Sequence, residues 1–169
     1  QGYGAALTKA IESSSGELVI TMDSDGQFDI ADAIEPIETL PESIDVQAGY
    51  RKAKKDSLFK VLADRIMNRM IRVMFGVSFR DTNCALKVIR KESLDKFKLE
   101  ARGFQLPTEI VLKANVLNLN VTEFPVNHRE RPGGQSSLAP FKTGWNMFIF
   151  LWYLRRKFRL YKKGVLRSI

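Results

Sequence analysis

Two carboxylates one residue apart, Asp23 and Asp25, are the residues whose types and spacing most directly suggest chemistry. They follow residues 18–22, a short apolar run with the composition of a buried strand. Such carboxylates can share a hard cation, Mg²⁺ or Mn²⁺, and leave coordination positions for diphosphate oxygens. Gln27, two residues further on, can add a carbonyl ligand or a sugar contact. Asp23, Asp25 and Gln27 are therefore the candidate residues for binding a metal and a diphosphate.

Residues 23–26 also have the composition of an ordinary turn, because Asp, Ser and Gly favour turns for local reasons. The motif alone does not decide between a turn and a metal site. A calcium loop is excluded by spacing, because its required glycine falls on Phe28 and its last acidic ligand falls on Ile34. A dinucleotide fingerprint is excluded as well, because its third glycine falls on Leu7.

The elements that must position these carboxylates alternate between helical and strand patterns. Apolar spacing predicts helices over residues 5–11, 30–40, 57–75 and 107–117, and strands over residues 18–22, 44–50, 86–89 and 121–126. This alternation predicts an α/β fold with a mixed, mainly parallel sheet flanked by helices. In such sheets ligands gather at the carboxyl ends of the strands, which is where Asp23 is expected.

The charge of the chain is divided unevenly. The 169 residues carry a formal charge of +8, made up of −9 over residues 1–50 and +17 over residues 51–169. A segment this basic indicates an anionic partner such as a phosphorylated substrate, anionic lipid or nucleic acid. The single cysteine, Cys84, excludes an internal disulfide and a cysteine-based zinc cluster, and it favours a reducing compartment.

Several blocks of the sequence, taken in order, resemble the family 2 glycosyltransferases of the polyprenyl-phosphate type. That group contains dolichol-phosphate mannose synthases and bacterial undecaprenyl-phosphate sugar transferases. The blocks are residues 2–7, 19–27, 49–51, 80–87, 103–104 with 107–110, and 131–136. They are spread over residues 2–137, so we expect a partial glycosyltransferase domain over residues 1–140.

The resemblance implies a Rossmann-like GT-A fold and a hexosyltransferase that inverts the configuration of the transferred sugar. The implied donor is a nucleotide-diphosphate sugar, and the implied acceptor is a dolichyl or undecaprenyl phosphate at the cytoplasmic face of a membrane. A Mg²⁺ or Mn²⁺ ion is implied near Asp25, which makes Asp25 a candidate catalytic residue. The resemblance also implies that the first strand and helix of the fold, which carry much of the base-binding pocket, precede Gly2.

The acceptor side is expected to be built from arginines. By the resemblance, Arg51, Arg65 and Arg131 match positions that bind the acceptor phosphate, and the planar arginine fork suits that task. A lipid phosphate is already nucleophilic and needs positioning cations more than a general base. A saccharide hydroxyl acceptor, the alternative, requires a carboxylate base. Asp81 and Glu109 are the candidates for that role.

The last part of the chain predicts an amphipathic, basic segment at a membrane interface. Residues 145–154 are aromatic and aliphatic, and a run of Lys and Arg follows from Arg155 onward. Such a segment can lie among lipid headgroups with its cations over anionic lipid. We assign residues 141–169 to it, and a terminal helix that packs on the core is the alternative.

An alternative of another class is a non-enzymatic, basic protein that binds nucleic acid or membranes. It is suggested by the sequence pI of about 9.7. No helix-turn-helix, zinc or aromatic-platform motif accompanies the charge, so a nucleic-acid partner is not expected.

Overall fold

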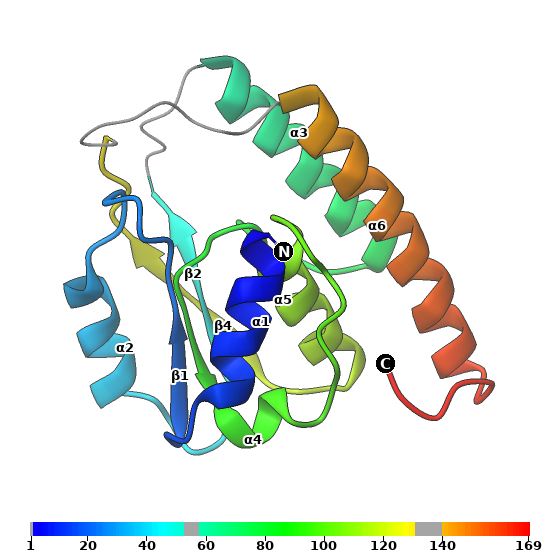
Figure 1. Cartoon of the computed structure of the whole chain (residues 1–169), viewed down its shortest axis with the longest axis horizontal. Coiled ribbons are helices and arrows are strands. Elements are labelled where there is room, and N and C mark those ends of the chain that lie inside the picture. The colour runs from blue at the N-terminus through cyan, green and yellow to red at the C-terminus, as the bar shows by residue number, and fades with distance from the viewer. Residues whose placement is uncertain (1, 53–57, 131–139) are drawn as a thin grey trace.

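The structure, a computed structural model, describes residues 2–52, 58–130 and 140–169 (Figure 1). Its elements in chain order are α1 (Tyr3–Ser13), β1 (Leu18–Thr21), the 3-10 helix η1 (Ile30–Ala33), α2 (Ile34–Glu38), β2 (Val46–Arg51), α3 (Leu58–Phe75), β3 (Lys87–Arg90), α4 (Lys91–Leu94), α5 (Leu106–Val116), β4 (Val121–Val126) and α6 (Pro140–Lys162). The predicted helices and strands are all present, most of them with bounds shifted by one or two residues, and the short helix α4 was not predicted.

The described strands form one mixed sheet in the order β1-β3-β2-β4. β1, β2 and β4 run in the same direction, whereas β3 runs in the opposite direction between β1 and β2. The predicted α/β sheet is therefore confirmed, and three of its four described strands share a direction. The expected predominance of parallel pairing is wrong for this part of the chain, because the central position of β3 makes two of its three pairings antiparallel.

Two elements differ from their predicted form. We expected β1 to be buried on both faces, but Ile20 is 38% exposed, because β1 lies at one edge of the described sheet. The helix predicted over residues 30–40 is divided into η1 and α2. Asp29 caps η1 by accepting a hydrogen bond from the Ala31 N–H at 3.0 Å. Pro36 falls in the first turn of α2, where its missing N–H costs no intrahelical bond.

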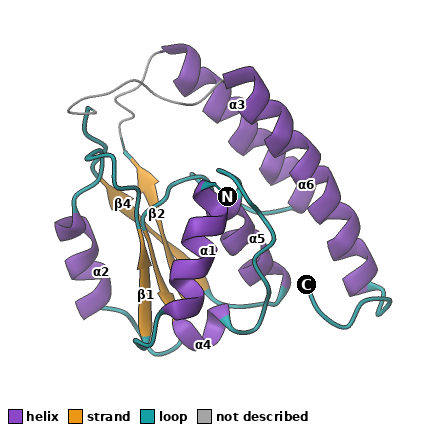
Figure 2. Ribbon diagram, viewed as in Figure 1, coloured by secondary structure: helices purple, strands orange, loops and turns teal. Residues whose placement is uncertain are grey.

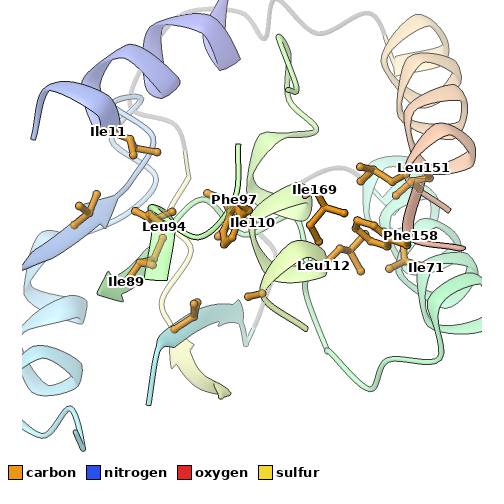
Figure 3. Close-up of a cluster of buried hydrophobic side chains, with 14 of the residues drawn as sticks. Ile11, Ile71, Ile89, Leu94, Phe97, Ile110, Leu112, Leu151, Phe158 and Ile169 are labelled. Atoms are coloured by element: carbon orange, nitrogen blue, oxygen red, sulfur yellow. The ribbon is translucent and has the colours of Figure 1, made fainter. Parts of the chain in front are cut away.

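Helices cover both faces of the sheet (Figure 2). Successive side chains of a strand point to opposite faces, so Val88 and Ile89 of β3 enter different clusters. Val88 packs with residues of η1, β4 and α2. Ile89 lies in the larger cluster (Figure 3), to which α1, α3, α5 and α6 all contribute buried side chains.

The last helix, α6, belongs to that larger cluster. Its buried residues Met147, Leu151, Leu154 and Phe158 recur at helical spacing, and Phe158 lies edge-on to Phe75 of α3 with ring centroids 5.8 Å apart. The core-packing alternative for residues 141–169 therefore describes one face of α6. None of the helices in the described part of the chain is long and apolar enough to pass through a membrane.

Candidate functional site

The direction of the strands brings most of the predicted site residues to one edge of the sheet. Because β1, β2 and β4 run the same way, their carboxyl ends share an edge. Asp23 follows β1, Arg51 ends β2 and Asn127 follows β4. The antiparallel strand β3 begins at this edge, with Lys87 opposite Thr21 at the end of β1. The turn at residues 81–84, which precedes β3, therefore lies at the same edge.

Asp23 carries a buried oxygen that suits a cation. Its Oδ1 atom is buried and has no hydrogen-bond partner within the described ranges. Burial raises the pKa of Asp23, and a hydrogen bond from the Tyr3 side chain opposes this rise. A buried carboxylate oxygen without a partner costs free energy unless a cation or a donor reaches it. This oxygen fits the predicted metal.

Asp25 shapes the loop that follows Asp23. Its Oδ1 atom accepts a hydrogen bond from the Gln27 backbone N–H at 3.1 Å. Gly26 has φ 78°, in the left-handed region that favours glycine. The chain bends over residues 24–28, which agrees with the turn chemistry expected near residues 23–26. This geometry is compatible with metal binding because it holds Asp25 and Gln27 together.

The two carboxylates do not form a complete metal site by themselves. In residues 2–52, 58–130 and 140–169, no group of three or more His, Cys, Asp or Glu side chains could hold a metal ion. A cation at Asp23 and Asp25 would need further oxygen ligands. The side-chain carbonyl of Gln27 and the oxygens of a bound diphosphate are the groups that can supply them.

Within the described residues, Arg51 contacts the carboxylates of Asp81 and Asp64. Its Nε and Nη2 atoms donate to the two oxygens of Asp81 at 2.7 and 3.0 Å, and Nη2 also donates to Asp64 Oδ2 at 3.2 Å. The side chain of Asp81 is 3% exposed and that of Asp64 is 18% exposed. The planar fork therefore faces a buried carboxylate on one side and a more accessible one, from α3, on the other.

The turn that presents Asp81 is fixed by buried polar contacts. Asn68 Oδ1 of α3 accepts hydrogen bonds from the Thr82 N–H at 3.0 Å and from its hydroxyl at 3.1 Å. Lys87 is fully buried and donates to the carbonyl oxygens of Thr82 and Cys84. Burial lowers the pKa of Lys87, and the nearby carboxylates Asp81 and Asp23 oppose that change.

Glu109 has a different environment from the one expected of a base. Its side chain is fully buried in α5, and its oxygens accept hydrogen bonds from the Glu100 N–H at 2.9 and 3.1 Å and from the Ala101 N–H at 2.8 Å. Lys113 forms an ion pair with it at 2.8 Å. These contacts make Glu109 an anchor for the loop before α5.

That loop packs on the start of α1, beside Asp23. The Gly4 N–H donates to the Arg102 carbonyl at 3.1 Å, and the rings of Tyr3 and Phe104 stack with centroids 5.0 Å apart. A Cβ atom at Gly4 would lie 2.5 Å from the Ala101 carbonyl oxygen, so only glycine fits. Glu109 thus binds the backbone of the loop that packs against Tyr3.

The remaining predicted residues are placed as follows. Arg65 lies on α3 with an exposed side chain, directly after Asp64. Arg131 lies outside the described residues. Cys84 is fully buried, and burial raises its pKa to about 11, which agrees with a packed residue and not a nucleophile.

Sequence reasoning missed three contributors to this edge. Asp64 and Lys87 gave weak signals: Asp64 is one turn from Asn68 on α3, and Lys87 ends one of the matched blocks. Arg129 gave none, because its contacts with Gln27 and Asp29 join segments about 100 residues apart.

Comparison with known proteins now adds to this geometry. Residues 1–97 match the profile of glycosyl transferase family 2. Undecaprenyl-phosphate 4-deoxy-4-formamido-L-arabinose transferases of Salmonella paratyphi B and Salmonella newport are 32% identical over 138 residues, which is 82% of this chain and 41% of theirs. The chain therefore spans less than half the length of these relatives.

Solved structures share the fold. Glucosyl-3-phosphoglycerate synthase from Mycobacterium tuberculosis in complex with Mn²⁺, UDP-glucose and glycerol 3-phosphate superimposes with a TM-score of 0.63 at 18% identity, over 92% of this chain and 55% of that one. Its complex with phosphoglyceric acid gives a TM-score of 0.64 at 18% identity, with the same coverage. The predicted GT-A-like fold is confirmed by this similarity.

Proposed function

The chain belongs to glycosyl transferase family 2, and from that premise we propose that it moves a sugar from a nucleotide-diphosphate sugar to a polyprenyl phosphate, with inversion. The observation that carries the proposal is the meeting of Asp23 and Asp25 with Arg51 at one edge of the sheet. Carboxylates suit the metal of a donor diphosphate, and an arginine fork suits an acceptor phosphate.

On the donor side, Asp23, Asp25 and Gln27 would hold a divalent cation. Such a cation offsets the charge that develops on the leaving nucleotide diphosphate. The buried Asp23 Oδ1 and the turn that ties Asp25 to Gln27 support this assignment. A complex of the fold neighbour from Mycobacterium tuberculosis contains Mn²⁺ together with UDP-glucose, which agrees with a metal-dependent donor site.

On the acceptor side, Arg51 would bind phosphate in place of Asp64. Of the carboxylates that contact Arg51 within the described residues, Asp64 is more exposed than Asp81, so it is the one that an incoming phosphate can displace. Asp81 would stay bound and keep the fork in its plane. Arg65 and Arg131 remain proposed partners of the same phosphate.

The geometry favours a phosphate acceptor over a saccharide hydroxyl. A hydroxyl acceptor needs a carboxylate base, but Asp81 is paired with Arg51 and Glu109 is bound by backbone N–H groups and Lys113. The Salmonella relatives are named as transferases to undecaprenyl phosphate, which supports the same acceptor class. The family match does not favour a non-enzymatic nucleic-acid-binding protein.

We also propose that the protein works at the cytoplasmic face of a membrane. The helix α6 exposes Trp145, Ile149 and Trp152, and α3 exposes Leu58, Leu62 and Ile66 at four-residue spacing. Figure 1 shows the beginnings of these two helices at the same end of the molecule. Apolar helix faces of this kind, next to basic residues, are typical of interfacial helices.

The test uses Asp25→Asn. We expect this variant to lose at least about a hundredfold of its metal-dependent glycolipid formation, because a neutral amide binds a hard cation poorly. The assay follows radiolabelled sugar transfer from UDP- and GDP-sugars to undecaprenyl phosphate, with Ser24→Ala as the matched control.

Two outcomes would contradict parts of the proposal. Unchanged activity of Asp25→Asn would contradict the metal assignment. Product found only on saccharide acceptors, with none on the lipid phosphate, would contradict the acceptor assignment.

A further inference from the structure

Residues 127–129, directly after β4, contact the loop over residues 23–29 (the metal loop). These contacts take no part in the proposed reaction. The Arg129 N–H donates to the Gln27 carbonyl at 2.9 Å, and Gln27 Nε2 donates to the Arg129 carbonyl at 3.3 Å. The Arg129 guanidinium pairs with Asp29 Oδ2 at 2.6 Å. These three contacts join Arg129 to both Gln27 and Asp29.

Neighbouring residues continue the same pairing. Asn127 donates from its backbone N–H and its side-chain amide to the two oxygens of Asp32, each at 3.0 Å. The rings of Phe28 and His128 lie edge to face with centroids 5.5 Å apart. The two residues that precede Arg129 therefore also hold this segment against the metal loop.

This arrangement determines which way the Gln27 amide faces. A glutamine amide has a donor side, Nε2, and an acceptor side, Oε1. Because Nε2 is bound to the Arg129 carbonyl, Oε1 is turned away from Arg129. A cation binds the oxygen and is repelled by the amide hydrogens. The orientation of the amide therefore matters for any metal held beside it.

We propose that Arg129 and Asp29 are a positioning pair for the metal site: they hold the Arg129 carbonyl where it fixes the Gln27 amide with its oxygen available to the cation. The inference rests on the proposed function, because it assumes that Gln27 is a metal ligand. Asp29 is itself fixed, since its other oxygen caps η1 through the Ala31 N–H. Groups that orient metal ligands typically change metal affinity by about 10- to 100-fold when they are removed.

The experiment measures Mn²⁺ binding, with UDP present and no turnover, by calorimetry and by the electron paramagnetic resonance signal of free Mn²⁺. Arg129→Ala and Asp29→Asn should each raise the Kd for Mn²⁺ by about tenfold. Asp29→Asn keeps an oxygen that can cap η1, so it removes mainly the ion pair. Arg129→Lys should recover part of the affinity. Lys91→Gln, which breaks an exposed ion pair on α4, is the matched control and should leave the Kd unchanged.

A double-mutant cycle separates positioning from a general structural role. If Arg129 acts through Gln27, then Arg129→Ala should raise the Kd no further once Gln27→Ala is in place, because the group that it orients is gone. A loss of stability alone would add in both backgrounds. Additive effects, or a Kd within twofold of wild type for both single variants, would overturn the inference.

Asp25→Asn in the same titration tests the proposed metal site separately from the positioning pair. If Asp25→Asn weakens Mn²⁺ binding while Arg129→Ala and Asp29→Asn do not, only the positioning pair is overturned. If the wild-type chain binds no Mn²⁺, or Asp25→Asn binds it as well as wild type, both the proposed metal site and the positioning pair are overturned.

Discussion

Asp23 shows at the scale of one residue what a proposed metal ligand costs in stability when no metal is bound. Its carboxylate lies at the end of a strand, with a buried oxygen that has no partner in the described part of the chain. Burial raises its pKa, so the native fold favours the protonated form. At neutral pH the ionised group therefore lowers stability, and this penalty appears as pH rises through the raised pKa.

We predict that Asp23→Asn stabilises the metal-free protein at pH 7 while it weakens metal binding. Removing the buried charge should raise Tm by about 2–4 °C, which corresponds to roughly 1 kcal/mol in a chain of this size. The gain should shrink as pH falls toward the ordinary range of a carboxyl group, because wild-type Asp23 then becomes neutral too. Calorimetry in EDTA at several pH values measures the Tm of the metal-free protein, and a Mn²⁺ titration without EDTA measures the metal binding.

The control is Asp95→Asn, which removes an exposed carboxylate next to α4. It should leave Tm within about 1 °C of wild type. A lower Tm for Asp23→Asn at pH 7 would show that the charge of Asp23 is well compensated, for example by Arg51 and Lys87, and would contradict the expected cost.

At the scale of elements, Glu100 joins the loop before α5 to two helices. Its carboxylate accepts hydrogen bonds from Lys113 at 2.7 Å, Lys157 at 2.6 Å and the Tyr153 hydroxyl at 2.8 Å. Burial by itself would raise the pKa of Glu100, but these donors outweigh it and lower the pKa to about 2. The same loop supports Tyr3 beside Asp23, so α6 is connected to the site through Glu100.

We predict that Glu100→Gln destabilises the protein by about 1–2 kcal/mol at pH 7, after allowance for solvent screening of a partly exposed group. The sign follows from the lowered pKa: the ionised carboxylate stabilises the fold above its usual pKa near 4.5, and this contribution is lost as pH falls toward 2. Urea unfolding at pH 7, 4 and 3 should therefore show a difference that narrows with acidity.

Glu12→Gln, an exposed change on α1, is the control for that series and should show little difference at any pH. If the Glu100→Gln difference instead stayed constant from pH 7 to pH 3, the loss would come from packing and not from the charge of Glu100.

At the scale of the whole molecule, α3 and α6 pack on the core with one face each and expose apolar side chains on the other. Trp152 of α6 is 53% exposed and Leu62 of α3 is 56% exposed. An exposed apolar surface of this kind marks a site of interaction. Together with the basic charge of residues 51–169, it is the basis of the proposed membrane surface.

We predict that Leu62→Glu and Trp152→Glu each reduce binding to vesicles that contain anionic phosphatidylglycerol by at least about fivefold, because each variant places a carboxylate at the lipid surface. Vesicle sedimentation measures the change. The matched control is Ile34→Glu, an equally exposed change on α2, which should bind as wild type does. Equal losses in all three variants would mean that the two helices form no specific membrane surface.

The sequence by itself determined the order and type of the larger elements, the turn chemistry of residues 23–26 and the family. These features depend on local patterns: apolar periodicity, the backbone preferences of Asp and Gly, and short blocks of matched residues. Asp23 could be placed at a strand end for the same reason, because the strand and the turn that follows it are adjacent in the chain.

Only the tertiary structure decided which carboxylates were committed to other partners. The contacts of Arg51 with Asp64 and Asp81, and of Arg129 with Gln27 and Asp29, join segments that are far apart in sequence. The direction of β3 also depended on its neighbours, since a strand as short as Lys87–Arg90 can pair in either direction. Such contacts depend on how the sheet brings strand ends together, and no local pattern in the chain encodes them.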